Sequence, residues 1–235
     1  MRILILLLAL LLTAIPLTVR AQPRLPGLTE GVEYRSIEGG QPYRVLPPGM
    51  VEVAEVFAYT CPHCAHFAPM LDTWAKRLPA HARLVYVPAV FGRDDPWSRA
   101  YFAQEATHTV ANLHPQLFRA IHGGGTNSLS PNATTSQIVN YASRFASLNV
   151  PAFNAAINDE AALLPKLRKA YEFAQRSGVE GTPSLIVAGR YMILGNSYEE
   201  LLANAGKVVA ALAPRRATPA SRLAAPAARP AGKGR

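Results

Sequence analysis

Only two cysteines occur among the 235 residues, and both lie in the tetrapeptide Cys61-Pro62-His63-Cys64. A structural disulfide elsewhere is therefore excluded, and a disulfide within this motif closes too short a loop to stabilise the fold much. Two thiols at this spacing can instead form and reopen a disulfide, most readily when the first caps a helix that stabilises its thiolate. The sequence thus predicts a thiol–disulfide redox centre that needs no cofactor beyond the Cys61–Cys64 disulfide itself.

Long apolar runs are also scarce. The one clear run, Ile3–Leu12, follows the basic start Met1-Arg2 and is shorter than the roughly 20 residues that a membrane-spanning helix needs. The residues Val19-Arg20-Ala21 suit a cleavage site, so we predict residues 1–21 to be a removable secretory signal peptide rather than a membrane anchor. Disulfides persist outside the cytosol, and so short a signal is typical of bacterial export, so the predicted location is the periplasm.

Acidic residues are few, 15 against 24 lysines and arginines, but the resulting charge of +9 is concentrated at the two ends. Removing the two arginines of the predicted signal and the six basic residues after Leu212 leaves +1 for residues 22–212. A body so close to neutral does not indicate a face that binds nucleic acid. Residues 213–235 are mostly Ala, Pro and Arg without aromatics, which predicts a disordered, solvated tail in preference to a contact with anionic lipid.

Residues 22–212 are long enough for one domain with a substantial core. Residues 22–41 are weakly patterned and are predicted to be irregular, and the next segment, Pro42–Leu46, is predicted to be an edge strand. The segments Val51–Tyr59 and Arg83–Val90 are rich in valine and predict strands. Between them, apolar residues at helical spacing predict a helix from Cys61 onward: Phe67, Met70, Leu71, Trp74 and Leu78. A helix that connects two neighbouring strands makes them parallel.

A long helical region is predicted from Pro96 to Ser177, opened by Asp95 as its N-cap. Later starts and stops are expected at His114-Pro115, Thr135, Pro151, Leu163–Arg176 and Gly178. A strand–turn–strand hairpin at Ser184–Leu194 and a final helix at Tyr198–Leu212 complete the order. Because the hairpin adds antiparallel strands, the predicted class is α/β with a mixed central sheet.

The chemistry of the tetrapeptide follows from its place at a helix start. Pro62 is acceptable in the first turn, where its missing N–H would have no partner. Cys61 then meets free backbone N–H groups and the helix dipole, which favour a thiolate, so Cys61 is predicted to be the attacking and attacked sulfur. Cys64 lies one turn further in and resolves the mixed disulfide. His63, between them, can add positive or polar stabilisation to the thiolate.

Metal binding is the main competing interpretation of the motif. His108 and His114 have loosely suitable spacing for a zinc site, but Pro62 and the helix placement fit redox chemistry better, so no metal site is predicted. Covalent c-type haem requires a histidine directly after the second cysteine, where Ala65 stands, and is excluded.

Two separated segments resemble the DsbA family of periplasmic thiol:disulfide oxidants. They are Glu55–Cys64, which contains that family's active-site tetrapeptide, and Gly181-Thr182-Pro183-Ser184 about 120 residues later. The resemblance covers residues 43–212 and implies a thioredoxin fold with a helical insertion. It implies core segments at residues 43–95 and 179–212, with the insertion at residues 96–178.

The resemblance also implies roles for three residues outside the tetrapeptide. Pro183 matches the family's cis-proline, which faces the active site, and together with Thr182 it is expected to bind an extended substrate chain. DsbA proteins often have valine in place of Thr182, whereas reducing or isomerising relatives more often have threonine. Glu55 matches a buried acid that assists proton transfer at Cys64, and a buried carboxyl has a raised pKa.

The activity predicted from residues and resemblance together is disulfide donation by a monomeric exported oxidoreductase. Its expected partners are unfolded or reduced exported proteins, and a membrane protein resembling the quinone-coupled DsbB is expected to reoxidise it. Three alternatives stay open: a reductase or isomerase of the same fold, a chaperone that binds copper or zinc through the tetrapeptide, and a substrate-binding chaperone without redox cycling.

Overall fold

The computed structural model describes residues 24–126 and 128–214. The predicted signal peptide at residues 1–21 lies outside the described residues, and so does the predicted tail apart from residues 213 and 214. Within the described ranges, no helix combines the length and the apolar character that crossing a membrane requires.

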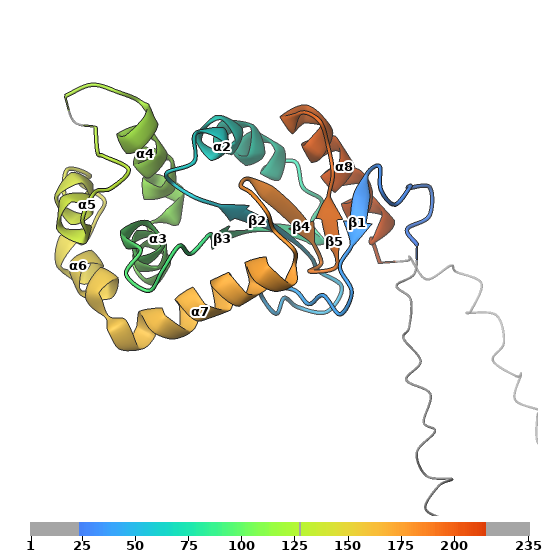
Figure 1. The fold of residues 1–235 in the computed structure, drawn as a ribbon, viewed down its shortest axis with the longest axis horizontal. Helices are drawn as coiled ribbons and strands as arrows, with labels where there is room; N and C mark the ends of the chain where they lie inside the picture. The colour runs from blue at the N-terminus through green and yellow to red at the C-terminus, as the bar shows by residue number, and fades with distance from the viewer. Residues whose placement is uncertain (1–23, 127, 215–235) are drawn as a thin grey trace, which may run out of the picture.

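A five-stranded sheet forms the centre of the molecule, in the order β1-β5-β4-β2-β3 (Figure 1). The strands are β1 (Tyr34–Ser36), β2 (Val51–Phe57), β3 (Ala82–Pro88), β4 (Ser184–Val187) and β5 (Tyr191–Ile193). β2 and β3 are parallel, and all other neighbours are antiparallel, which confirms the predicted mixed sheet. All seven residues of β2 are buried, as expected for a central strand covered on both faces.

Helices α2 (Pro62–Ala75) and α8 (Tyr198–Ala211) lie side by side over one face of the sheet (Figure 1). The apolar stripe predicted for α2 places Phe67 and Leu71 fully inside the cluster on that face, together with Val208 of α8. Only four residues separate the end of β2 from the start of α2, so the first turn of α2 stands at the carboxyl end of the central strand. The tetrapeptide is thereby fixed at one edge of the sheet.

Five consecutive helices lie between β3 and β4 and form most of the left half of Figure 1. They are α3 (Pro96–Ala106), α4 (Val110–His122), α5 (Thr135–Ala142), α6 (Val150–Asn158) and α7 (Glu160–Arg176). α3 is the centre of this region because it packs against each of the other four. Its residues from Trp97 to Gln104 are all buried, so this helix has no solvent-facing side over two turns.

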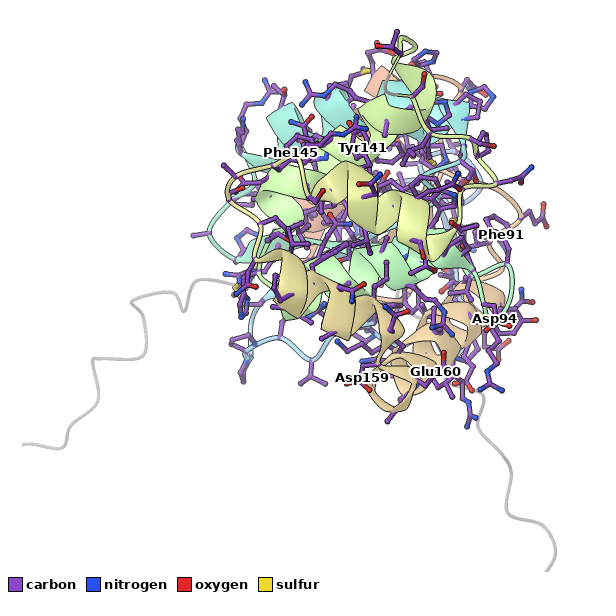
Figure 2. All side chains as sticks on the ribbon, turned by 90° about the vertical axis from the view of Figure 1, so that its left-hand side faces the viewer. Phe91, Asp94, Tyr141, Phe145, Asp159 and Glu160 are labelled. Atoms are coloured by element: carbon purple, nitrogen blue, oxygen red, sulfur yellow. The ribbon has the colours of Figure 1, made fainter. Side chains whose placement is uncertain are left out.

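α3 contains one buried cationic side chain, Arg99, whose charge is balanced by two more exposed carboxylates. Its guanidinium pairs with Glu160 at the start of α7 and, at 3.3 Å, with Asp94 in the loop before α3. Asp94 and Glu160 lie near one another at the lower right of Figure 2. The Arg99 side chain also donates to the Arg93 carbonyl. A buried arginine needs such partners, and here they join the beginning of α3 to the beginning of α7.

The prediction of an edge strand at Pro42–Leu46 is wrong. These residues form no strand, and the edge strand is β1, inside the segment that was predicted to be irregular. The backbone N–H groups of Tyr43 and Arg44 donate to the buried carboxylate of Glu52 instead of to a neighbouring strand. A three-residue strand such as β1 is too short to show the alternation that reveals strands in a sequence.

Helix boundaries in the inserted region also differ from the predictions. α4 begins at Val110, so the prediction that His114-Pro115 starts it is wrong, and Pro115 lies inside the helix. The proline removes one backbone donor, while the helix is held by buried contacts of Leu113, His114 and Leu117. The N-cap of α5 is Thr134 rather than Thr135. The hairpin prediction is confirmed, and its turn residues Ala188 and Gly189 both have the positive φ that such tight turns require.

Candidate active site

Cys61 is the N-cap of α2, and the local sequence explains why. Its backbone is extended, with φ −85° and ψ 117°, and Pro62 follows as the first helical residue. The Cys61 Sγ atom accepts a hydrogen bond from the Cys64 N–H at 3.4 Å, one of the donors that a helix start leaves without a backbone partner. As a thiol, Cys61 also donates to the Thr182 carbonyl at 3.2 Å.

The two cysteines have opposite electrostatic surroundings. Partial burial raises the pKa of the Cys61 thiol, but interactions with Thr182 and with the Cys64 and His63 backbone outweigh it, so this pKa lies below its ordinary value. Cys64 is fully buried, and burial raises the pKa of its thiol far above the ordinary range. Both are free thiols in this structure. Cys61, whose sulfur is accessible, is therefore the cysteine that ionises more readily to a thiolate.

His63 is exposed on the first turn of α2, and its Nδ1 atom lies 3.1 Å from the hydroxyl of Tyr198. Tyr198 is the first residue of α8, and its ring packs on Phe67 with centroids 5.2 Å apart. Sequence reasoning placed Tyr198 only at a helix start and did not include it in the site. No local signal could have done so, because the two partners are 135 residues apart in the chain.

Thr182 and Pro183 stand opposite Cys61, as the bond from Cys61 to the Thr182 carbonyl shows. The Thr182–Pro183 peptide bond is cis. A cavity of about 600 Å³ begins at these two residues and continues from the end of β5 along the loop to the start of α8, with His63 and Tyr198 in its wall. The cavity adjoins the accessible sulfur and has room for a segment of another chain.

Glu55 lies in the middle of β2 and is buried, 1 % exposed. Neither of its carboxylate oxygens has a hydrogen-bond partner in the described part of the chain. Burial, followed by repulsion from Asp72 and Cys61, raises the pKa of this carboxyl to about 8. Because the negative charges of Glu55 and Cys61 repel one another, the protonation state of the Glu55 carboxyl is linked to whether Cys61 is a thiolate.

A second polar cluster, which was not part of the predicted site, anchors Tyr59, two positions before Cys61. The Tyr59 hydroxyl lies 2.7 Å from Nδ1 of the buried His114 and accepts a hydrogen bond from Gln104 Nε2 at 2.9 Å. The Tyr59 carbonyl accepts from His122 Nε2 at 2.8 Å. Gln104 belongs to α3 and both histidines belong to α4, so three side chains of the inserted region anchor the active-site loop.

The buried imidazole of His114 predicts a loss of stability in acid. Burial lowers the pKa of His114 from the ordinary 6.5 to about 3, so the unfolded chain binds this proton more tightly than the folded one. We therefore expect the unfolding free energy of the wild type, relative to a His114→Gln variant, to fall by about 1.4 kcal/mol for each pH unit below 6.5. Urea unfolding curves of both proteins between pH 7.5 and 4.5 measure this difference.

A Tyr59→Phe variant is the control for this prediction. It removes the hydroxyl partner of His114 but keeps the buried imidazole, so it should be less stable at every pH and keep the slope of the wild type. Parallel curves for the wild type and His114→Gln would show that His114 does not titrate on unfolding.

Residues 24–126 and 128–214 contain no cluster of three or more His, Cys, Asp or Glu side chains that could hold a metal ion. His108 and His114, the histidines with loosely suitable spacing for zinc, have other surroundings. His108 is in the left-handed conformation with φ 56° just before α4, and His114 is bound to Tyr59 inside the core.

Comparison with known proteins agrees with the geometry. The family model described as Thioredoxin matches residues 47–204. The thiol:disulfide interchange protein DsbA of Bordetella parapertussis is 34% identical over 160 residues, covering 64% of this chain and 71% of that protein. DsbA of Pseudomonas aeruginosa strain PAO1 is 30% identical over 166 residues, covering 69% and 74%.

Solved structures extend the likeness to the fold. The crystal structure of the oxidoreductase DsbA from Xylella fastidiosa has a TM-score of 0.68 and 33% identity, and the match covers 80% of this chain and 97% of that one. For Pseudomonas aeruginosa DsbA the TM-score is 0.69 at 28% identity, with 78% and 93% covered. The predicted α/β thioredoxin fold is confirmed. The chain belongs to the DsbA family of thiol:disulfide interchange proteins and is an oxidoreductase.

Proposed function

We propose that this protein is exported to the periplasm and donates its Cys61–Cys64 disulfide to reduced proteins that arrive there. The observation that carries the proposal is the asymmetry of the pair. Cys61 is accessible and has a lowered thiol pKa, whereas Cys64 is buried and has a raised one. A stabilised thiolate favours the reduced protein over its disulfide, which makes the disulfide a strong oxidant.

The proposed reaction moves two electrons from substrate to enzyme. A substrate thiolate attacks Cys61 Sγ, the Cys61–Cys64 bond breaks, and Cys64 leaves as a thiolate that takes up a proton. A second substrate thiolate then attacks the substrate sulfur of the mixed disulfide, and Cys61 leaves as the thiolate that the start of α2 stabilises. The substrate gains a disulfide, and the enzyme is left as the dithiol seen in this structure.

Glu55 supports the proton step. It is the buried group whose pKa, about 8, allows it to take up and release a proton near neutrality, and its charge interacts with both cysteines. A water molecule or a small movement of the side chain would connect it to the Cys64 sulfur when that sulfur is the leaving group. We propose that Glu55 acts in this way as the acid and base for Cys64.

Thr182, Pro183 and the adjoining cavity are the proposed binding site for an extended segment of substrate. Main-chain groups beside Pro183 offer the edge-type pairing that unfolded chains of any sequence can make. Completing a cycle requires an oxidant for the dithiol, and a membrane protein like the quinone-coupled DsbB fits this role. The redox-active disulfide is the only redox group that this scheme uses.

The reduction potential tests the direction of transfer. We expect the Cys61–Cys64 pair, equilibrated in glutathione buffers, to have a potential close to about −120 mV, the value characteristic of DsbA, and far from the about −270 mV of thioredoxin. Trp97 can report the state of the pair, because its ring lies 5.9 Å from that of Tyr59 beside the active-site loop. A value near that of thioredoxin would instead indicate a reductase.

The reduction potential of a Thr182→Val variant tests the contribution of the Thr182 side chain. Hydrogen bonding to Thr182 lowers the pKa of both cysteine thiols. Valine keeps the Thr182 carbonyl but lacks the hydroxyl, so the share of this effect that comes from the hydroxyl is lost and the dithiol form should be destabilised. We expect a potential about 15 to 30 mV more negative, equivalent to about a three- to tenfold change in the equilibrium constant. Thr73→Val, which removes a hydroxyl from the exposed side of α2, is the matched control and should leave the potential unchanged.

A further inference from the structure

The contact between His63 and Tyr198 has no part in the reaction scheme above, yet it joins the tetrapeptide to another helix. Tyr198 is fixed from two sides. Ser197 caps α8 by accepting from the Glu200 N–H at 3.1 Å, and the Tyr198 ring packs on the buried Phe67 of α2. The hydroxyl is thereby held in one place, 3.1 Å from His63 Nδ1.

His63, by contrast, has little to hold it. It is exposed on the first turn of α2, and across the described ranges Tyr198 is the one side chain that hydrogen-bonds to its ring. Without that bond the imidazole would be free to exchange among rotamers. An imidazole that stabilises a neighbouring thiolate must stay near it, because the interaction weakens with distance and solvent screening.

From these contacts we infer that Tyr198 is a positioning residue: its hydroxyl fixes the imidazole of His63, a residue whose backbone already interacts with Cys61, and so stabilises the Cys61 thiolate. The inference rests on the thiol–disulfide exchange of this site but not on its direction. The hydroxyl is suited to the task because its oxygen accepts from an Nδ1–H, while its own proton can be donated to an Nδ1 that has none. The hydrogen bond can therefore form whether or not Nδ1 carries a hydrogen.

Tyr198 itself adds no opposing charge. Burial, then the nearby charges of Cys61 and Cys64, raise the pKa of its phenol, so the hydroxyl stays protonated beside the thiolate. The other titratable groups near Cys61 are Cys64 and His63 of α2 and Glu55 of β2.

Ultraviolet titration of the Cys61 thiolate in the full-length dithiol protein tests the inference. Tyr198→Phe removes only the hydroxyl and keeps the ring on Phe67. We expect the Cys61 pKa to rise by about 0.5, a threefold loss of thiolate stability. His63→Ala should raise it by at least as much, and adding Tyr198→Phe to His63→Ala should have no further effect, since the hydroxyl acts through the imidazole.

Tyr141→Phe is the matched control. Tyr141 lies on α5, on the face of the inserted helices shown in Figure 2, where its hydroxyl donates to the Gln116 carbonyl at 3.3 Å. This variant should leave the Cys61 pKa unchanged. An unchanged pKa in Tyr198→Phe, or an equal shift with and without His63, overturns the inference. A reductase-like potential with the expected shifts would overturn only the proposed direction of transfer.

Discussion

A Cys64→Ser variant is expected to stop at the mixed disulfide, whereas Cys61→Ser is expected to form almost none. The Cys61 thiolate attacks oxidised glutathione, forms a Cys61–glutathione disulfide and releases one glutathione thiolate. In the wild type, Cys64 then displaces the second glutathione and closes the Cys61–Cys64 disulfide. Without Cys64 that adduct persists, and intact-mass spectrometry detects it.

The Cys61→Ser variant leaves a sulfur that is fully buried and whose thiol pKa burial raises. Both access and thiolate fraction are lost, so we expect adduct formation at least about 100-fold slower than in Cys64→Ser. Equal rates in the two variants would contradict the asymmetry on which the mechanism depends. The wild type serves as the reference, because it should pass through the adduct to the closed disulfide.

Replacing Glu55 by leucine is expected to stabilise the protein at alkaline pH. Burial raises the pKa of Glu55 from 4.5 to about 8, so the unfolded chain releases this proton more readily and the fold loses stability as pH rises between these values. Leucine carries no charge and leaves no polar atom unpaired. We expect the excess of Glu55→Leu over the wild type in unfolding free energy to grow by about 4 kcal/mol between pH 4.5 and pH 8.

Glu52→Leu is a matched control three residues away on the same buried strand. Its carboxylate accepts hydrogen bonds from the Tyr43 and Arg44 N–H groups, at 2.8 and 2.6 Å, so its loss leaves two backbone donors without their acceptor. Glu52→Leu should therefore lower the unfolding free energy, by about 2 kcal/mol or more. The explanation of Glu55 fails if both variants are destabilised to the same degree at pH 8. Denaturant unfolding of the dithiol form at both pH values measures all three proteins.

The parts of the fold that could be predicted are those encoded by neighbouring residues. Pro62 and the apolar spacing after Cys61 predict α2, and the structure begins that helix at Pro62. The hairpin β4–β5 was found because its two turn residues separate short apolar segments. In both places the backbone follows from residues within a turn or two of one another, which is the range over which sequence patterns carry information.

The rest depends on contacts between distant segments. β1 exists because Tyr34–Ser36 pairs with β5, more than 150 residues away, and nothing in its own three residues shows this. The tetrapeptide could be read directly, but Tyr198 could not, because its role comes from the place where α8 meets α2. Likewise, His114 appeared in the sequence as a helix start or a distant metal ligand, and only the folded chain places it against Tyr59.

The anchoring of Tyr59 has a consequence for protein engineering. A designer who wished to shorten this enzyme by joining Asp95 directly to Val179 would keep the whole sheet, α2, α8 and the complete tetrapeptide. The shortened chain would nevertheless lose Gln104, His114 and His122, the three side chains that fix the loop leading into Cys61. The inserted region as a whole is thus not a removable module, because α3 and α4 carry these three side chains. The smallest unit that preserves the anchoring of Tyr59 includes at least α3 and α4.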